Sequence, residues 1–175
     1  MCSSDLPFTW PSVVGGPDNV IADGQIIDLS GSGNELGFLG AAGFGAASGS
    51  GTITYTDGST QPYSISMADW FNNAAVSGDE IATTTTSWNF ASTTQAKHPV
   101  SVYFASVPLD PHKTVASVTL PTVGSGVGNG INAMHIFSIA AGNGTPTSGE
   151  ASALASHKAG RGTAGEAHFR ARAGG

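Results

Sequence analysis

Hydrophobic and polar side chains alternate along several short stretches of the chain with a period of two residues, which is the period of a β-strand. In residues 100–121, Val100, Val102 and Phe104 share one face. Pro108 should end this run because proline has no N–H to donate to a neighbouring strand. Residues 109–113 are typical of a turn, and 114–120 form a second run rich in Val and Thr.

A second hairpin is predicted around Asp57 and Gly58. Residues 51–56 and 60–67 alternate on either side of them, and Asp-Gly between two alternating runs is a strong hairpin signal. Pro62 in the second run indicates a strand at the edge of a sheet, because an edge strand tolerates a missing N–H donor.

Further strands are predicted at residues 25–29, 35–41, 80–87 and 131–140. With about nine short strands and turn signals every ten or so residues, the pattern is typical of an all-β protein. We expect an antiparallel two-sheet β-sandwich, jelly-roll or immunoglobulin-like. Its predicted core is Ile53, Tyr55, Ile65, Val102, Phe104, Val118, Leu120, Ile136 and Phe137.

The two ends differ in character from the body. Residues 1–7 are expected to be a gene-model artefact or disordered, because the first six match the translation of a common sequencing adapter. Residues 8–140 form the predicted β-sandwich domain. Residues 141–175 are rich in Gly, Ala and Ser, which predicts a linker or a disordered tail with a weak helix at 151–159.

The charge of the chain excludes some classes of partner. The formal net charge is −6 and the isoelectric point is about 5.1, so we expect no nucleic-acid partner, which would require a basic surface. We also expect no membrane partner, because an anionic bilayer would repel an acidic protein. A single cysteine, Cys2, allows no internal disulfide. No cofactor is expected, and the chain is predicted to be monomeric.

No set of residues in the sequence marks a catalytic site. There is no G-x-S-x-G motif, and the histidines are scattered without the spacing of zinc ligands. Asp79 and Glu80 are adjacent and would point to opposite faces of a strand, so they make a poor acid–base pair. We interpret these acids, and Asp69, as turn residues facing solvent. The chain is therefore predicted not to be an enzyme.

Aromatic side chains are the best candidates for ligand contact. Trp10, Trp70, Trp88, Phe90 and Tyr103 could stack on the C–H face of a sugar ring. The pattern favours Trp70 as a core residue, and His98 and His135 as structural.

Trp88 begins a long irregular stretch, and loops on a rigid scaffold often carry binding sites. The amide of Asn89 offers both a donor and an acceptor. Trp88, Asn89 and Phe90, together with the glycine-rich segment 124–130, are therefore the predicted carbohydrate-binding residues, although Trp88 could equally anchor its loop.

The segments FTWP (residues 8–11), PDNV (17–20), GQIIDLSGSGNELGFLGAA (24–42), GTITYTDGSTQPYSISMADW (51–70) and VPLDPHKTVASVTLP (107–121) together resemble an accessory module of secreted, multidomain glycoside hydrolases, mainly actinobacterial. The resemblance covers residues 8–140. A more distant similarity is to galactose-binding-like and other carbohydrate-associated β-sandwiches. It implies no particular site residues.

The resemblance implies a non-catalytic, extracellular module that binds a polysaccharide or glycan beside the catalytic domain of the same parent chain. Two alternatives remain open at this point. The module could be a structural spacer packed on its catalytic neighbour, or an extracellular adhesion domain without affinity for sugars.

Overall fold

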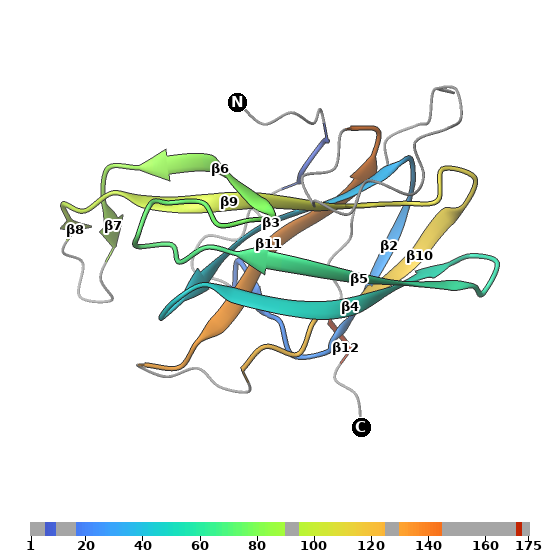
Figure 1. Cartoon of the computed structure of the whole chain (residues 1–175), viewed down its shortest axis with the longest axis horizontal. Helices are drawn as coiled ribbons and strands as arrows, with labels where there is room; N and C mark the ends of the chain where they lie inside the picture. Colours follow the sequence, from blue (N-terminus) through green and yellow to red (C-terminus); the bar gives the residue numbers. More distant parts are fainter. Residues whose placement is uncertain (1–5, 10–16, 90–94, 125–129, 145–170, 173–175) are drawn as a thin grey trace.

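The computed structural model describes residues 6–9, 17–89, 95–124, 130–144 and 171–172. Its strands form two five-stranded sheets in which all neighbours are antiparallel (Figure 1). The first, here the β3 sheet, has the order β1 (Val20–Ile21), β11 (Ala133–Gly142), β3 (Glu35–Gly43), β9 (Val100–Pro108) and β6 (Asp79–Thr85). The second, the β4 sheet, has the order β12 (Ala171–Arg172), β2 (Ile26–Ser32), β10 (Thr114–Thr119), β4 (Ala47–Tyr55) and β5 (Thr60–Met67).

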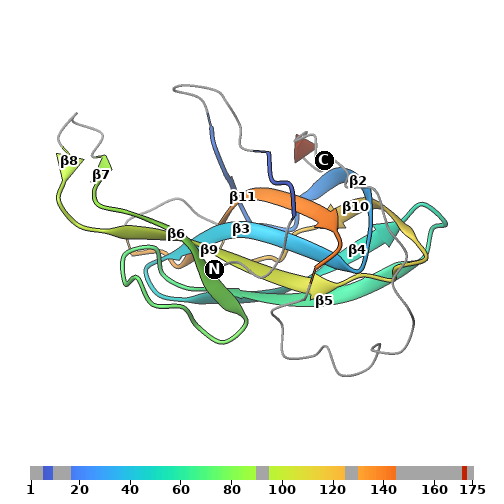
Figure 2. The same ribbon diagram turned by 90° about the horizontal axis from the view of Figure 1, so that it is seen from above.

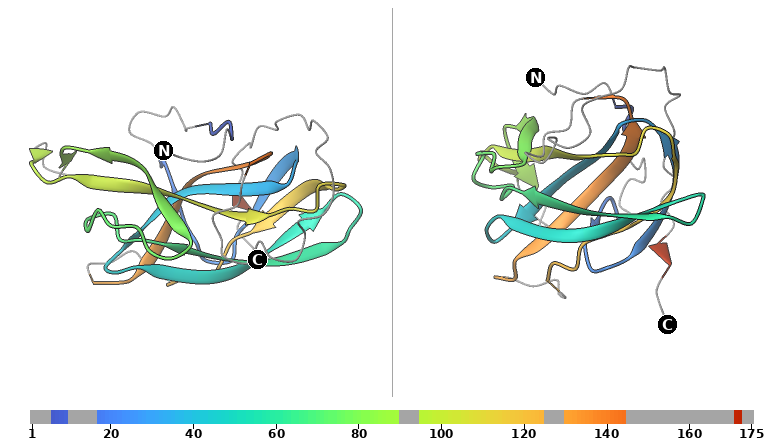
Figure 3. Two further views of the ribbon diagram at one scale, coloured as in Figure 1. Left: turned by 45° about the horizontal axis from the view of Figure 1, so that its top comes forward. Right: turned by 45° about the vertical axis from the view of Figure 1, so that its right-hand side comes forward.

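The predicted antiparallel β-sandwich is therefore confirmed, because the two sheets enclose a common core. Within each sheet the strands change direction strongly, from β4, β5 and β9 along the long axis to β2, β10 and β11 lying obliquely across it (Figure 1). This is the twist expected of β-sheets. A small hairpin of β7 (Trp88–Asn89) and β8 (Gln95–Ala96) extends β6 and β9 at one end (Figures 2 and 3).

The hairpin predicted at Asp57 and Gly58 joins β4 to β5. The Asp57 carboxylate accepts a 2.9 Å hydrogen bond from the backbone N–H of Ser59, and Gly58 has φ 82°, which glycine adopts without steric cost. Pro62 lies on β5, which is the last strand of its sheet. The prediction of an edge strand at Pro62 is confirmed.

Seven of the nine predicted core residues are buried, and two are not. Phe104, for example, is 0% exposed, whereas Val102 and Phe137 are only half-buried. Tyr103, which the sequence offered as a stacking residue, is instead 0% exposed and donates a 3.1 Å hydrogen bond to the Asp69 carbonyl. The strand period therefore identified which residues share a face, but not how completely each face is covered.

A second hydrophobic cluster lies on the outer face of the β3 sheet. Leu6 and Phe8 pack there against Phe104 and Leu39, and the Phe8 and Phe104 rings meet edge to face at 5.9 Å. The close approach depends on Gly37, where an added Cβ would lie 2.4 Å from the Leu6 side chain. One half of this face is thus covered by the N-terminal segment, including Leu6 from the part assigned to an artefact.

The C-terminal part of the sandwich extends beyond residue 140. Strand β11 continues to Gly142, and Gly144 exchanges two hydrogen bonds with the Asn34 side chain. Strand β12 pairs with β2, whereas the weak helix predicted at 151–159 lies outside the described residues. Within the described ranges, no helix is long and apolar enough to cross a membrane.

Candidate binding site

The site begins where β3 and β9 separate. These strands pair from Glu35↔Pro108 to Gly40↔Tyr103, and beyond that point the start of the β5–β6 connection inserts between them. The N–H of Trp70 donates to the Ala42 carbonyl at 2.9 Å, and the N–H of Ser101 donates to the Trp70 carbonyl at 2.9 Å. Trp70 therefore bridges the two strands through its backbone.

Two buried carboxylates hold this inserted segment in place. Asp69 accepts hydrogen bonds from the N–H groups of Gly45 at 2.6 Å and Phe71 at 2.9 Å. Asp79 accepts from Ala68 at 2.6 Å and Val76 at 2.7 Å, while burial raises its pKa. Both acids are less than 10% exposed. The prediction that they face solvent is wrong, because backbone N–H groups in the turns required acceptors there.

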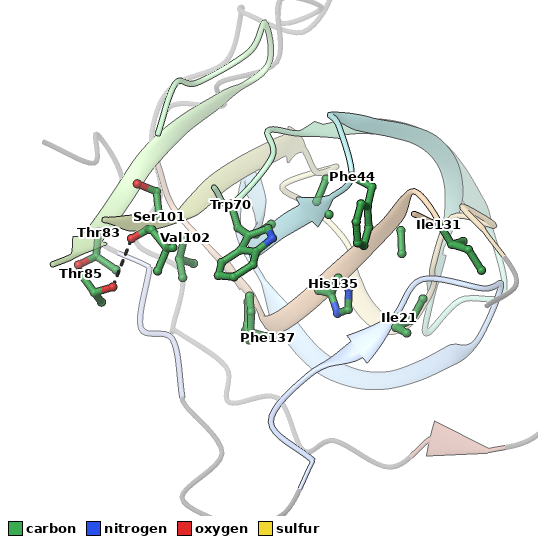
Figure 4. A pocket seen from close by; sticks show the side chains of 15 residues that line it. Ile21, Phe44, Trp70, Thr83, Thr85, Ser101, Val102, Ile131, His135 and Phe137 are labelled. Carbon is green, nitrogen blue, oxygen red and sulfur yellow. Dashed lines mark hydrogen bonds between the residues drawn. The ribbon is translucent and has the colours of Figure 1, made fainter. Parts of the chain in front are cut away.

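Beside Trp70, a pocket of about 460 Å³ opens on the half of the outer face of the β3 sheet that Leu6, Phe8 and the other described residues leave uncovered. Figure 4 shows Trp70 near the middle of the lining residues, with Phe44 and Ile131 to one side and Val102, Thr83 and Thr85 to the other. The described lining residues are Ile21, Ala41, Ala42, Gly43, Phe44, Trp70, Thr83, Thr85, Val100, Ser101, Val102, Ile131, Ala133, His135 and Phe137. None of them is Asp, Glu, Lys or Arg.

Small residues and large residues occupy different parts of the pocket. Ala41, Gly43 and Ala133 are neighbours on β3 and β11, since Gly43 is paired with Ala133 and Ala41 with His135. These small side chains let a ligand approach the sheet closely. Phe44 and Ile131 are 57% and 41% exposed and form a rim above them.

Phe44 has an unusual backbone conformation, with φ 58°, which is rare for an aromatic residue. Its turn is fixed from two sides. The Asn132 side-chain amide lies within 3.0–3.4 Å of the carbonyl oxygens of residues 43–46, and the Asp69 carboxylate binds the Gly45 N–H. Strained residues held by such surroundings are concentrated at ligand sites.

His135 is the one ionisable side chain among the described lining residues. Its Nδ1 lies 2.9 Å from the Asn19 side-chain oxygen, and the Asn19 amide nitrogen donates to Asp18 at 2.7 Å. Burial lowers the pKa of His135, while the Asp18 charge acts in the opposite direction. At neutral pH the imidazole is therefore uncharged.

An aromatic cluster supports Trp70 from the side of the β7–β8 hairpin. The Trp70 and Trp88 rings meet edge to face with centroids 5.3 Å apart, and Phe71 lies 6.5 Å from Trp88. His98 stacks on Phe71 at 3.7 Å, and its Nε2 donates to the Phe71 carbonyl at 3.0 Å. The cluster fixes the position of the Trp70 ring.

The predicted site residues have different positions relative to this pocket. Trp88 is half-buried against Trp70 and is not part of the described lining. Asn89 lies in β7, with its side chain outside the described part, and Phe90 falls outside the described residues altogether. Of the predicted segment 124–130, residues 125–129 lie outside the described residues, and Gly130 directly precedes the lining residue Ile131.

Sequence reasoning missed Phe44, Ile131 and His135 as pocket residues and placed Val102 and Phe137 in the core. For Phe44 the sequence did contain a signal of exposure. This aromatic residue is flanked by glycines in a run of small residues, where no alternating strand pattern predicts a buried side chain. The role of Trp70 had no local signal, because it depends on the separation of β3 and β9.

Among the described residues, no group of three His, Cys, Asp or Glu side chains could hold a metal ion. A comparison with protein-family models and with curated protein sequences finds no match to this chain.

Proposed function

We propose that this chain is a non-catalytic module that binds a neutral glycan and acts beside the catalytic domain of a secreted glycoside hydrolase. The observation that carries the proposal is the aromatic, uncharged pocket around Trp70. Sugar rings present apolar C–H faces, which stack on aromatic side chains, and a volume of about 460 Å³ is within the range of small-molecule sites. The uncharged lining favours a neutral ligand over a uronic acid or a phosphate.

Trp88 keeps a role in this proposal, although it differs from direct stacking. The indole packs on the edge of Trp70 and holds that ring beside the pocket. Removing Trp88 should weaken binding, because the Trp70 ring would lose the contact that holds it beside the pocket. Removing Trp70 should abolish binding, because the stacking surface itself is lost.

The test is calorimetric titration of the purified chain with a panel of neutral oligosaccharides and soluble polysaccharides. Ile131→Ala and Ile26→Ala form a matched pair, because both side chains are exposed but Ile26 lies on β2 in the opposite sheet. We expect Ile131→Ala to weaken binding, Trp70→Ala to abolish it and Ile26→Ala to leave it unchanged, with thermal melting to verify folding. Equal losses for both isoleucine variants would refute the pocket as the site.

A second function, a spacer that packs on the neighbouring catalytic domain, is favoured by the exposed apolar rim of Phe44 and Ile131. In that case no glycan of the panel binds. The wild-type chain instead binds a separately purified catalytic domain in a manner that depends on Ile131 and not on Ile26.

A further inference from the structure

The pocket offers a ligand very few polar groups. The Ser101 hydroxyl donates to the Asn73 side-chain oxygen at 2.7 Å, and the Thr85 hydroxyl donates to the Ser87 carbonyl at 2.9 Å. Among the polar side chains of the described lining, this leaves the Thr83 hydroxyl, the Trp70 indole N–H and the His135 imidazole for a ligand. A sugar that buried many hydroxyls here would lose hydrogen bonds to water without replacement.

The hydrogen-bond network determines what His135 can offer. Because the Asn19 amide nitrogen donates to Asp18, the Asn19 oxygen faces His135 and must accept a hydrogen bond from the Nδ1–H group. A neutral imidazole that is protonated on Nδ1 has an unprotonated Nε2. Nε2 has no hydrogen-bond partner among the described residues, so it can accept a hydrogen bond from a ligand.

The bottom of the pocket is suited to a small apolar group. Ala41 is paired with His135, and Gly43 is paired with Ala133, two residues before His135 on β11. None of these three small residues carries more than a methyl group. A ligand methyl can approach this surface closely. The pocket therefore combines an aromatic wall, one acceptor and a small apolar surface.

We infer that the glycan carries N-acetylated amino sugars, as chitin-type chains do. In this arrangement the sugar ring stacks on Trp70, the acetamido N–H donates to Nε2 of His135, and the acetyl methyl lies on Ala41, Gly43 and Ala133. An acetamido group replaces a hydroxyl with one N–H donor, one carbonyl acceptor and one apolar methyl. Its donor matches Nε2 of His135, its methyl matches the small residues, and its carbonyl oxygen can accept from the donors at the pocket or from water. This inference rests on the proposed glycan-binding function and specifies its ligand.

The first experiment compares two neutral trisaccharides that share their linkage, N,N′,N″-triacetylchitotriose and cellotriose, by calorimetry at pH 7.5. One hydrogen bond and one buried methyl group predict about ten- to fiftyfold tighter binding of the acetylated chain. Equal affinity would overturn the N-acetyl inference and leave glycan binding intact. If neither trisaccharide nor any glycan of the wider panel binds, the proposed function fails as well.

The second experiment tests the acceptor. His135→Phe retains an aromatic ring without an acceptor, and His112→Phe is the matched control, because His112 is exposed in the turn between β9 and β10, outside the described lining of the pocket. We expect His135→Phe to bring the two trisaccharides to within about threefold of each other, while His112→Phe retains the full preference. A folded His135→Phe variant that keeps the preference would overturn the role of His135.

Discussion

Phe44→Asn should weaken ligand binding while changing the free energy of unfolding only slightly. The residue has φ 58° and is 57% exposed at the rim of the pocket. In this left-handed conformation, L-residues other than Gly, Asn and Asp lose about 1–2 kcal/mol, and Asn would recover much of that. Because the surrounding turn is held by Asn132 and Asp69, the backbone should retain its course after the substitution.

The loss of buried surface acts against this gain. A fully buried Phe removes about 200 Å² from water, and the exposed fraction of Phe44 leaves about 90 Å² buried, which corresponds to roughly 2 kcal/mol as an upper limit. The two terms nearly cancel. We expect the free energy of unfolding to fall by about 1 kcal/mol or less, measured by urea denaturation.

Binding should change far more than stability. Phe44 encloses one side of the pocket, so Phe44→Asn should weaken triacetylchitotriose binding by about tenfold or more. Ile26→Asn is the control for the substitution, because Ile26 is 52% exposed and lies on β2 in the opposite sheet, outside the described lining. It has no positive φ to relieve and should lose more stability. A loss above about 3 kcal/mol for Phe44→Asn would show that Phe44 is a packing residue. Unchanged binding would exclude the rim from the site.

Three further predictions concern the rest of the molecule. Glu35 is 0% exposed, and neither carboxylate oxygen has a hydrogen bond of ordinary geometry among the described residues. Burial raises the pKa of Glu35. The Ser106 hydroxyl lowers this pKa in part, and the negative charge of Glu80 raises it further. Since the folded state binds the proton of the Glu35 carboxyl group more tightly than the unfolded state does, the free energy of unfolding should fall as pH rises above about 4.5. Glu35→Leu should remove this pH dependence of the free energy of unfolding, measured by urea denaturation, and raise stability at pH 7. Phe104→Ala should cost about 3–5 kcal/mol by the same measurement, and a loss below 1 kcal/mol would contradict its burial. For His135, whose pKa is lowered by burial, protonation below pH 6.5 should weaken triacetylchitotriose binding, and a pH-independent affinity would contradict an acceptor at Nε2.

Local pattern was sufficient to predict the eight long strands of this fold, β2 to β6 and β9 to β11, but not the two-residue strands β1, β7, β8 and β12. The β7–β8 hairpin lies in the stretch that was predicted to be irregular. The alternation in residues 51–67 and the Asp-Gly pair determine the β4–β5 hairpin, since both signals lie within the hairpin itself. Residues 131–140 are apolar on both faces, which is the pattern of a central strand, and β11 does lie between β1 and β3. Such features depend on neighbours in the sequence.

The candidate site depends on contacts between distant parts of the chain, which local pattern does not report. Trp70 reaches the pocket because β3 and β9 separate at Gly40 and Tyr103, and those residues are 63 positions apart. Val102 and Phe104 share a face of β9, yet only Phe104 is covered, by Phe8 from the N-terminal segment. The alternation cannot distinguish them, because it reports the face and not what covers it.

The outer face of the β3 sheet thus has two halves with different consequences for substitution. Where Leu6 and Phe8 cover Phe104, each apolar side chain loses contact with water on folding and contributes to stability. Around Trp70 the same face remains open, so Val102 and Phe137 contribute only part of their surface to folding. The remainder is available to the proposed ligand, so Val102 and Phe137, which the sequence assigns to the core, lie instead at the proposed site. Substitutions in the covered half should therefore change the denaturation midpoint, and substitutions in the open half should change ligand affinity.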